Sequence, residues 1–175
     1  MTSIDIQYWS MVGTWLAGFG TLLAVAVALW TSKQNNKILL KIIAGHRTLI
    51  QQGVSGHKDY CMIRIVNIGI KVANIVSIGW VVGRGKNKRY FSQILGFPES
   101  DTLPKILNEG ETANILIPLD NWTKEFSRDI LSNQNLNIIK TLKVTVYTSS
   151  GEEFQALVED GLIDKLTVAG KNFSN

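Results

Sequence analysis

The chain has 175 residues, of which 45% are hydrophobic, and its formal net charge is +4. This length suits one anchored domain and excludes two full-sized ones, and a single cysteine excludes an internal disulfide. Residues 31–95 hold eleven Lys or Arg and one Asp, whereas residues 96–175 hold seven Lys or Arg and twelve acidic residues, so the basic half directly follows the N-terminal segment.

The first element in chain order is a long apolar segment. Residues 6–32 contain no charged side chain, and residues 11–30 form a predominantly apolar run of 20 residues. A helix of that length covers about 30 Å, which is the thickness of the hydrocarbon core of a bilayer. Tyr8 and Trp9 before the run and Trp30 at its end suit the two aromatic belts of a membrane span. The sequence therefore predicts a transmembrane helix over residues 11–30.

Three alternatives compete with a membrane span for this segment. A secretory signal peptide would carry basic residues before the apolar run, where only Asp5 is charged, although Ala24-Val25-Ala26 resembles a cleavage site. A buried helix of a soluble protein is seldom apolar on every face. An interfacial helix needs a polar face, which this segment lacks. A membrane span fits these features best.

The basic residues around the apolar run predict its orientation. Four follow it and none precedes it: Lys33, Lys37, Lys41 and Arg47. The positive-inside rule then places the tail over residues 1–10 outside and the C-terminal part in the cytoplasm. We expect a single-pass protein of the bacterial inner membrane, with residues 31–37 as a basic juxtamembrane linker that contacts anionic headgroups.

Small residues recur along the predicted helix at spacings of three and four and therefore share one face: Gly13, Ala17, Gly20, Ala24 and Ala28. Such faces let helix backbones approach closely in lipid, and they favour self-association. Gly and Ala are also common in membrane helices that stay single. The stripe predicts a homo-oligomer held together by this face.

The rest of the chain shows short β-branched or alternating segments separated by turn signals. They cover residues 38–43 with a return at 49–50, and 61–66, 75–82, 90–94, 113–119, 142–147 and 154–158. About seven strands at this spacing predict an immunoglobulin-like β-sandwich over residues 38–167, with a C-terminal tail over 168–175. One helix is expected where Trp122, Phe126 and Ile130 recur every fourth residue, and a second short helix over 159–166.

Sequence motifs of catalysis are absent. The chain has no P-loop, no G-x-S-x-G, no H-E-x-x-H and no G-x-G-x-x-G. His46 and His57 lack a third ligand at matching spacing for a metal, and Cys61 in an apolar run is expected to be buried. We therefore expect no enzyme, with no catalytic residue, no cofactor and no metal site.

The segment GRGKNKR over residues 83–89 is predicted to form a tight basic hairpin. Its cations are candidate contacts for anionic headgroups or a partner, together with the juxtamembrane lysines: Lys33, Lys37, Lys41, Arg84, Lys86, Lys88 and Arg89. A solvated hairpin tip would explain the same charges. Nucleic acid is a less favoured partner, because no aromatic platform or known motif accompanies them.

The layout resembles a group of small membrane-anchored proteins of unknown function in bacterial and prophage genomes. The likeness lies in an N-terminal W-S-x-x-G-T-W-x-A-G-x-G-T-L-x-A-V-x-V-A-L-W helix, in V-N-I-G at 66–69 and in I-G-W-V-V-G at 78–83. The resemblance implies a cytoplasmic β-sandwich, and some proteins of this build accompany anti-phage systems. It assigns no catalytic residue.

Three functional hypotheses follow. The first is a membrane effector in phage defence or superinfection exclusion, with a sandwich that senses or assembles and a self-associating helix. The second is an inert anchored adaptor that recruits an unidentified cytoplasmic protein. The third, less favoured, is a nucleic-acid-binding module that uses the basic hairpin. Toxicity on expression separates the first two, and salt-dependent retention on nucleic acid would support the third.

Overall fold

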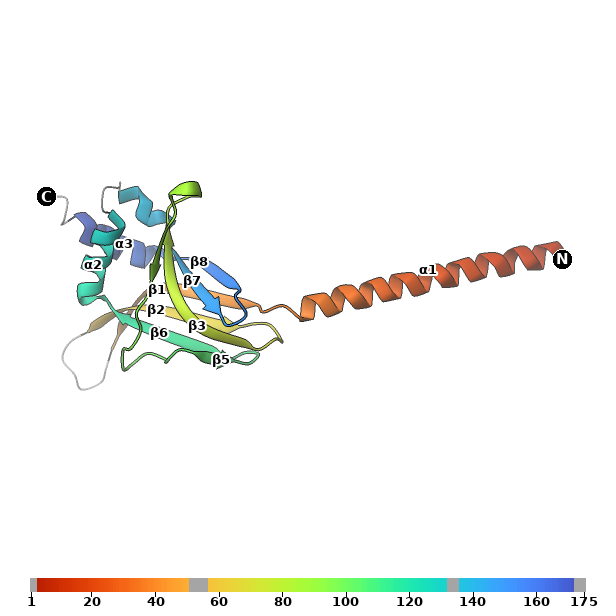
Figure 1. The fold of residues 1–175 in the computed structure, drawn as a ribbon, viewed down its shortest axis with the longest axis horizontal. Helices are drawn as coiled ribbons and strands as arrows, with labels where there is room; N and C mark the ends of the chain where they lie inside the picture. The colour runs from red at the N-terminus through yellow and green to blue at the C-terminus, as the bar shows by residue number, and fades with distance from the viewer. Residues whose placement is uncertain (1–2, 51–56, 132–135, 172–175) are drawn as a thin grey trace. The chain divides into compact units, whose positions relative to one another are not determined.

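The chain forms two units, Met1–Lys37 and Ile38–Asn175, which are described separately. The structure is a computed structural model, and it describes residues 3–50, 57–131 and 136–171. The first unit contains one helix. The second unit contains all the described strands and is called the β-domain below (Figure 1).

The first unit is the helix α1, Ser3–Asn35, with 33 residues. Its segment Gln7–Lys33 has a mean hydropathy of 1.9 and is long and apolar enough to cross a membrane. None of that segment is buried, so its apolar side chains remain exposed. The helix extends beyond the predicted span at both ends, because residues 3–10 and 31–35 contain neither Gly nor Pro to stop it.

Three threonines of α1 satisfy their hydroxyls within the helix. The Oγ1 atoms of Thr14, Thr21 and Thr31 donate to the carbonyls of Ser10, Gly18 and Val27, at 2.9, 2.8 and 2.9 Å. In hydrocarbon a polar group without an internal partner would cost several kcal/mol. The hydroxyl donors at these three positions are therefore all satisfied within α1.

The β-domain comprises eight strands among its described residues, two α-helices and two 3-10 turns. The strands are β1 Leu40–Leu49, β2 Lys58–Asn67, β3 Ala73–Val82, β4 Arg89–Ser92, β5 Lys105–Leu107, β6 Thr112–Pro118, β7 Lys143–Thr148 and β8 Glu153–Leu157. The helices are α2 Leu119–Leu131 and α3 Asp160–Lys171, and the turns are η1 Gly85–Asn87 and η2 Leu136–Thr141. A helix followed by a mainly-β domain, as predicted, is therefore confirmed.

The strands form two antiparallel sheets. One has the order β1-β2-β6, and the other has β4-β3-β7-β8 with β5 also paired to β3. A parallel bridge between Ala44 and Val158 joins β1 to the residue after β8. Alternate side chains of both sheets point into one core, as Ile63 on β2, Ile115 on β6 and Val144 on β7 do.

The predicted segments of the β-domain differ from the structure in several places, and β5 was not predicted at all. Residues 38–50 were expected to form a strand with its return, but β1 runs on through Gly45 and His46, which pair with Met62 and Cys61. The expected C-terminal tail is partly helical, because α3 continues to Lys171. Cys61 is fully buried, as predicted, and this burial raises the pKa of its thiol.

An aromatic cluster attaches α2 to the β4-β3-β7-β8 sheet. Trp122 stacks on Phe126 with ring centroids 4.6 Å apart, and Phe126 lies 5.4 Å from the ring of Trp80 on β3. Gln93 Oε1 accepts from the indole Nε1 of Trp80 at 2.9 Å and of Trp122 at 3.2 Å. The predicted helical spacing of Trp122, Phe126 and Ile130 therefore marks the face of α2 that packs on the sheet.

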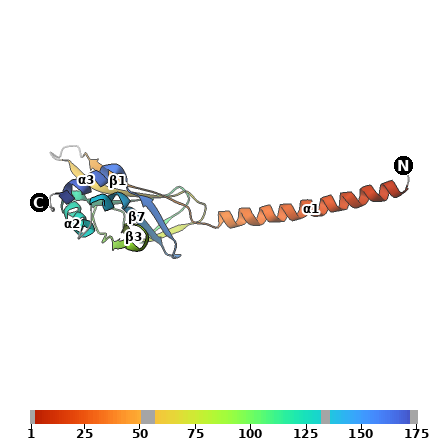
Figure 2. The same cartoon turned by 90° about the horizontal axis from the view of Figure 1, so that it is seen from above.

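The pairing defines two ends of the β-domain. The tether end carries the start of β1 at Leu40, which pairs with Asn67, and the start of β3 at Ala73, which pairs with Leu107. The far end carries the end of β3 at Val82, the start of β7 at Lys143 and the end of β8 at Leu157. The helices α2 and α3 also lie at the far end, because both follow strands that finish there (Figures 1 and 2).

Candidate functional site

A basic cavity lies at the far end of the β-domain, under the turn between β3 and β4. Its volume is about 380 Å³. It is lined by Gly83, Arg84, Gly85, Lys88, Lys140, Thr141, Lys143 and Leu157. Four of these side chains are cationic, and no acidic side chain lines the cavity among the described residues. A concave surface with converging positive charges attracts anionic groups.

Glycines allow the β3–β4 turn to fold over the cavity. Gly83 has a φ of +97° and Gly85 a φ of +60°, in the left-handed region that other residues adopt with strain. A Cβ atom on Gly83 would also overlap the backbone carbonyl oxygen of Asn87. The sequence motif Gly-Arg-Gly therefore builds a tight turn that sets the position of Arg84.

A hydrogen bond connects this turn to η2, on the other wall of the cavity. The Gly83 N–H donates to Thr141 Oγ1 at 2.8 Å, and that hydroxyl donates to the Ile138 carbonyl at 2.7 Å. Lys140 precedes Thr141 in η2, and Lys143 enters from β7, where it pairs with Val81. The two walls are thus fixed to each other, with cations on both.

Only some of the predicted hairpin cations line the cavity. Arg84 and Lys88 do, whereas Lys86 lies exposed on η1 and does not. Lys41 lies at the start of β1, and Lys33 and Lys37 belong to the first unit. The structure therefore divides the basic residues of the predicted site between separate regions.

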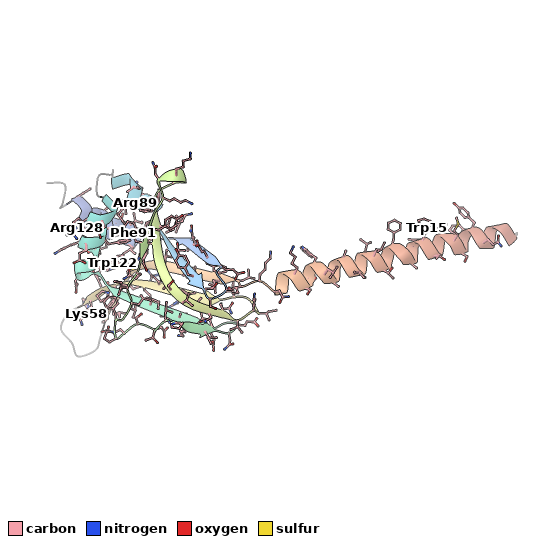
Figure 3. All side chains as sticks on the ribbon, viewed as in Figure 1. Trp15, Lys58, Arg89, Phe91, Trp122 and Arg128 are labelled. Carbon is pink, nitrogen blue, oxygen red and sulfur yellow. The ribbon has the colours of Figure 1, made fainter. Side chains whose placement is uncertain are left out.

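Arg89 has a different role from the other hairpin cations. Its guanidinium donates to the carbonyls of Asp129, at 3.1 Å, and Ile130, and it lies 5.7 Å from the centre of the Phe91 ring. Figure 3 shows Arg89 and Phe91 beside α2, the helix that carries Trp122. A cation on the last carbonyls of a helix is stabilising, so Arg89 fixes the end of α2.

Sequence reasoning missed Lys140 and Lys143. They follow the hairpin by about fifty residues, and only the pairing of β7 with β3 brings them to it. Lys143 lies near the start of the alternating segment 142–147 that predicted β7. Its place near a strand end could therefore be predicted from sequence, but its spatial neighbours could not.

A second polar cluster connects α3 to β1 and β2. Asp59 accepts from Thr48 Oγ1 at 2.7 Å, from Lys165 Nζ at 2.9 Å and lies 3.0 Å from His46 Nε2. The hydrogen bond from Thr48, followed by those from Lys165 and His46, holds the pKa of Asp59 well below its ordinary value. His46 is thus engaged by a carboxylate, and no group of three potential metal ligands occurs in the described part of the chain.

Arg47 strengthens the same attachment. Its Nη1 lies 2.7 Å from Glu159 Oε2, and Nη2 donates to Oε1 at 3.0 Å. This hydrogen-bonded pair lowers the pKa of Glu159. Since Glu159 directly precedes α3, the bidentate contact fixes the start of that helix against β1.

A larger, more open groove of about 800 Å³ runs between α2 and α3. Its charged lining residues are of both signs, Lys124 and Lys165 beside Asp164. Lys165 is already engaged by Asp59. We therefore take the smaller basic cavity, where charges of one sign converge, as the candidate site.

Comparison with known proteins gives distant structural likenesses. No protein-family model matches the chain, and no curated protein matches it. Fourteen chains of solved structures do match. One is the Northeast Structural Genomics Consortium target SoR45, 12% identical with a TM-score of 0.31, over 71% of this chain and 84% of that chain. Another is a Bordetella pertussis protein provisionally assigned as ApaA, 14% identical with a TM-score of 0.33, over 70% and 89%.

Proposed function

We propose that this protein is a membrane-anchored, non-enzymatic adaptor of bacteria whose β-domain binds an acidic cytoplasmic protein through the basic cavity. The observation that carries the proposal is the cavity itself, where four cations from the β3–β4 turn, η2 and β7 converge. Acidic peptide segments supply carboxylates that suit such a cluster, and charge complementarity speeds their encounter with it. Helix α1 keeps the domain at the bilayer.

The orientation of the anchor is part of the proposal. Lys33 and Lys37 follow the apolar run of α1 and no Lys or Arg precedes it, which supports a cytoplasmic β-domain and an external N-terminus. The internal hydrogen bonds of Thr14, Thr21 and Thr31 support burial of α1 in lipid.

We further propose that the β-domain is immunoglobulin-like. Taken in chain order, β1, β2 and β6 correspond to strands A, B and E, and β4, β3, β7 and β8 to strands C′, C, F and G. The sheet orders A-B-E and C′-C-F-G agree with that assignment. Loops gathered at the ends of such a sandwich are common binding sites, and the basic cavity lies at one end.

The test of the adaptor function is binding of a fluorescent hexaglutamate peptide to the full chain in nanodiscs of neutral lipid. We expect saturable binding that weakens with salt. Lys140→Gln with Lys143→Gln should weaken it at least about tenfold, which corresponds to ~1.4 kcal/mol. Lys86→Gln is the matched control, because Lys86 is on the same turn but outside the cavity.

Two results would contradict this function. An equal loss for Lys86→Gln would indicate a diffuse basic hairpin without a defined site. Tighter binding of a single-stranded oligothymidylate than of hexaglutamate, with a steep dependence on salt, would favour the nucleic-acid hypothesis.

A second candidate function is an effector in phage defence or superinfection exclusion, which the resemblance of the sequence suggests. The two-sided character of α1 favours it. Gly13, Ala17, Gly20, Ala24 and Ala28 share one face, whereas Trp15, Phe19 and Leu22 lie on the other. Such a helix would pack copies through its small face and disturb the bilayer.

In-membrane crosslinking with phage plating tests this effector. Gly20→Ile or Ala24→Ile keeps α1 apolar but holds neighbouring backbones apart, so oligomer and protection should both fall at least about tenfold. Leu22→Ile, off the small face, should change neither. Unchanged oligomer and plating for Gly20→Ile would leave the adaptor function alone.

A further inference from the structure

We propose that the tether end of the β-domain lies on the bilayer surface, with the β2–β3 turn inserted among the lipid headgroups. This inference rests on the membrane anchor of the proposed function. The occupant of the surface is the lipid of the membrane that α1 crosses. The contact would fix the orientation of the domain and keep the basic cavity directed toward the cytoplasm.

The tether end exposes large apolar side chains that come from three separate segments of the chain. They are Leu39, Ile68, Ile70, Val72 and Ile106, here called the apolar rim. Ile70 is 64% exposed, Ile106 61% and Ile68 57%. Several exposed side chains of this size at one end of a domain are unusual on a soluble surface, and such patches mark contact with a partner or a membrane.

The β2–β3 turn holds its isoleucines outward by a buried polar side chain. Asn67 is fully buried, and its Nδ2 donates to the carbonyls of Lys71 and Leu107, both at 2.9 Å. Its Oδ1 accepts from the Gly69 N–H at 3.0 Å. The turn is therefore rigid, and the exposure of Ile68 and Ile70 is a fixed property of the fold.

The chain itself keeps this turn close to the membrane. The Ile68 N–H donates to the Leu39 carbonyl at 2.9 Å, so the turn is bonded to the residue that precedes β1. Leu39 follows the end of α1, at Asn35, by four residues, which span at most about 14 Å. Trp30, at the end of the apolar run, precedes Asn35 by a further rise of about 7.5 Å. The apolar rim thus stays within reach of the bilayer surface.

The charges near the rim favour one side of the tether end for the contact. Lys37, Lys41 and Lys71 are exposed beside the start of β1 and the β2–β3 turn, and they suit anionic headgroups. Glu109 and Glu111 lie in the β5–β6 turn, which adjoins the β2–β3 turn because the Gly110 N–H donates to the Asn67 carbonyl at 2.8 Å. Glu152 lies in the β7–β8 turn, and Glu153 begins β8. Lipid contact through the β2–β3 turn would pair the lysines with phosphates.

Depth-dependent quenching of the full chain in nanodiscs tests the inference. Single substitutions Ile70→Cys, Leu23→Cys and Lys86→Cys each receive a nitrobenzoxadiazole label, and Cys61 stays unlabelled because it is fully buried. Lipids with a nitroxide near the headgroup should quench the label at position 70, at least about threefold more than the label at position 86. Lipids with a nitroxide deep in the chain should quench the label at position 23.

A paired variant separates lipid contact by the rim from proximity alone. Ile68→Ser in the Ile70→Cys background should reduce quenching at position 70 at least twofold. Ile94→Ser is the matched control, because Ile94 is 85% exposed but lies outside the rim, and it should leave quenching unchanged.

The outcomes distinguish this inference from the anchor on which it rests. Quenching at position 23 without quenching at position 70 would overturn the inference and leave the anchor intact. Absence of quenching at both would overturn both. A second copy of the chain could instead cover position 70. The label would then be protected from aqueous iodide but not quenched by the lipid nitroxides, and the protection would disappear in nanodiscs that hold one chain. That result would overturn the inference.

Discussion

The two turns at either end of β3 are built in similar ways but expose opposite chemistry. The β2–β3 turn is fixed by the side chain of Asn67 and exposes Ile68 and Ile70. The β3–β4 turn is fixed by Thr141 and presents Arg84 and Lys88 to the cavity. Each turn depends on one polar side chain that replaces missing backbone partners. In both turns, one set of residues fixes the backbone and a different set determines which side chains the turn exposes.

The strand between the turns sets their separation. β3 has ten residues, which span about 30 Å. The proposed lipid contact at the tether end and the proposed anion site at the far end could therefore act without interfering. Substitutions at one turn should leave the chemistry of the other unchanged, and this independence can be measured.

The largest effect is expected for Asn67→Ala. The substitution removes three hydrogen bonds of a fully buried side chain and leaves the carbonyls of Lys71 and Leu107 without those donors. We expect the free energy of unfolding of the β-domain to fall by about 3 kcal/mol. Urea denaturation of the full chain in detergent, followed by tryptophan fluorescence, measures it.

Asn114→Ala is the control for that variant. Asn114 lies on β6 and is half-buried, and its Oδ1 accepts a single bond from Arg64 Nε at 3.2 Å. A loss below about 1 kcal/mol is expected. Equal losses for the two variants would mean that Asn67 does not hold the β2–β3 turn in any special way.

Gly83→Ala should have the next largest effect and should act on the far end alone. Its φ of +97° and the overlap of a Cβ with the Asn87 carbonyl oxygen both oppose alanine. We expect a loss of about 2 kcal/mol in unfolding free energy, together with weaker hexaglutamate binding. Lipid quenching at position 70 should be unchanged.

Gly85→Ala provides the comparison within the same turn. Gly85 also has a positive φ, of +60°, but a Cβ there meets no atom within 4 Å. Only the conformational cost remains, so about 1 kcal/mol is expected. A larger loss for Gly85→Ala than for Gly83→Ala would contradict the packing of this turn over the cavity.

Apart from the control variants, the smallest effect is expected for Asp59→Asn, between the two ends. Asp59 connects β2 to α3 through Lys165, but its side chain is about one-third exposed, so solvent screening limits the loss to about 1 kcal/mol at neutral pH. Because the folded-state pKa of Asp59 lies below its ordinary value of 3.8, this stabilisation is complete above about pH 5 and is lost as the pH falls through that ordinary value toward the folded-state pKa.

Acid titration of stability checks that prediction. The difference between wild type and Asp59→Asn in urea denaturation should narrow as the pH is lowered from about 5 to about 2. A difference that grows in acid would contradict the depressed pKa of Asp59 and its ionic contact with α3.

Local patterns in the sequence were enough for most elements. The apolar run predicted α1 because composition alone decides whether a helix can cross a bilayer. The alternation in residues 113–119 predicted β6, and the inner side chains Ala113, Ile115 and Ile117 are all buried. Gly45 and His46 were misleading, because small and polar residues suggested a return where the chain continues as β1.

The candidate site was less predictable than the fold. The charge run at 84–89 is visible in sequence, but the partner of each charge is decided by tertiary pairing. Arg89 contacts the end of α2, whereas Lys143 reaches the cavity through β7. The turn at Asn67 was expected, but the three bonds of its side chain depend on Leu107, forty residues further along the chain.

The long register of β1 has a mechanical consequence. All ten residues of β1 pair with β2, and the chain from α1 enters at Leu40. If a bound partner pulls on the far end while the membrane holds α1, the pulling force would act on β1 along the axis of the strand. Hydrogen bonds of an antiparallel ladder lie perpendicular to the strands, so this shear would strain them all together and not one after another. If α1 is anchored in a bilayer as proposed, the β-domain would be joined to it through the strand whose pairing best resists such a load.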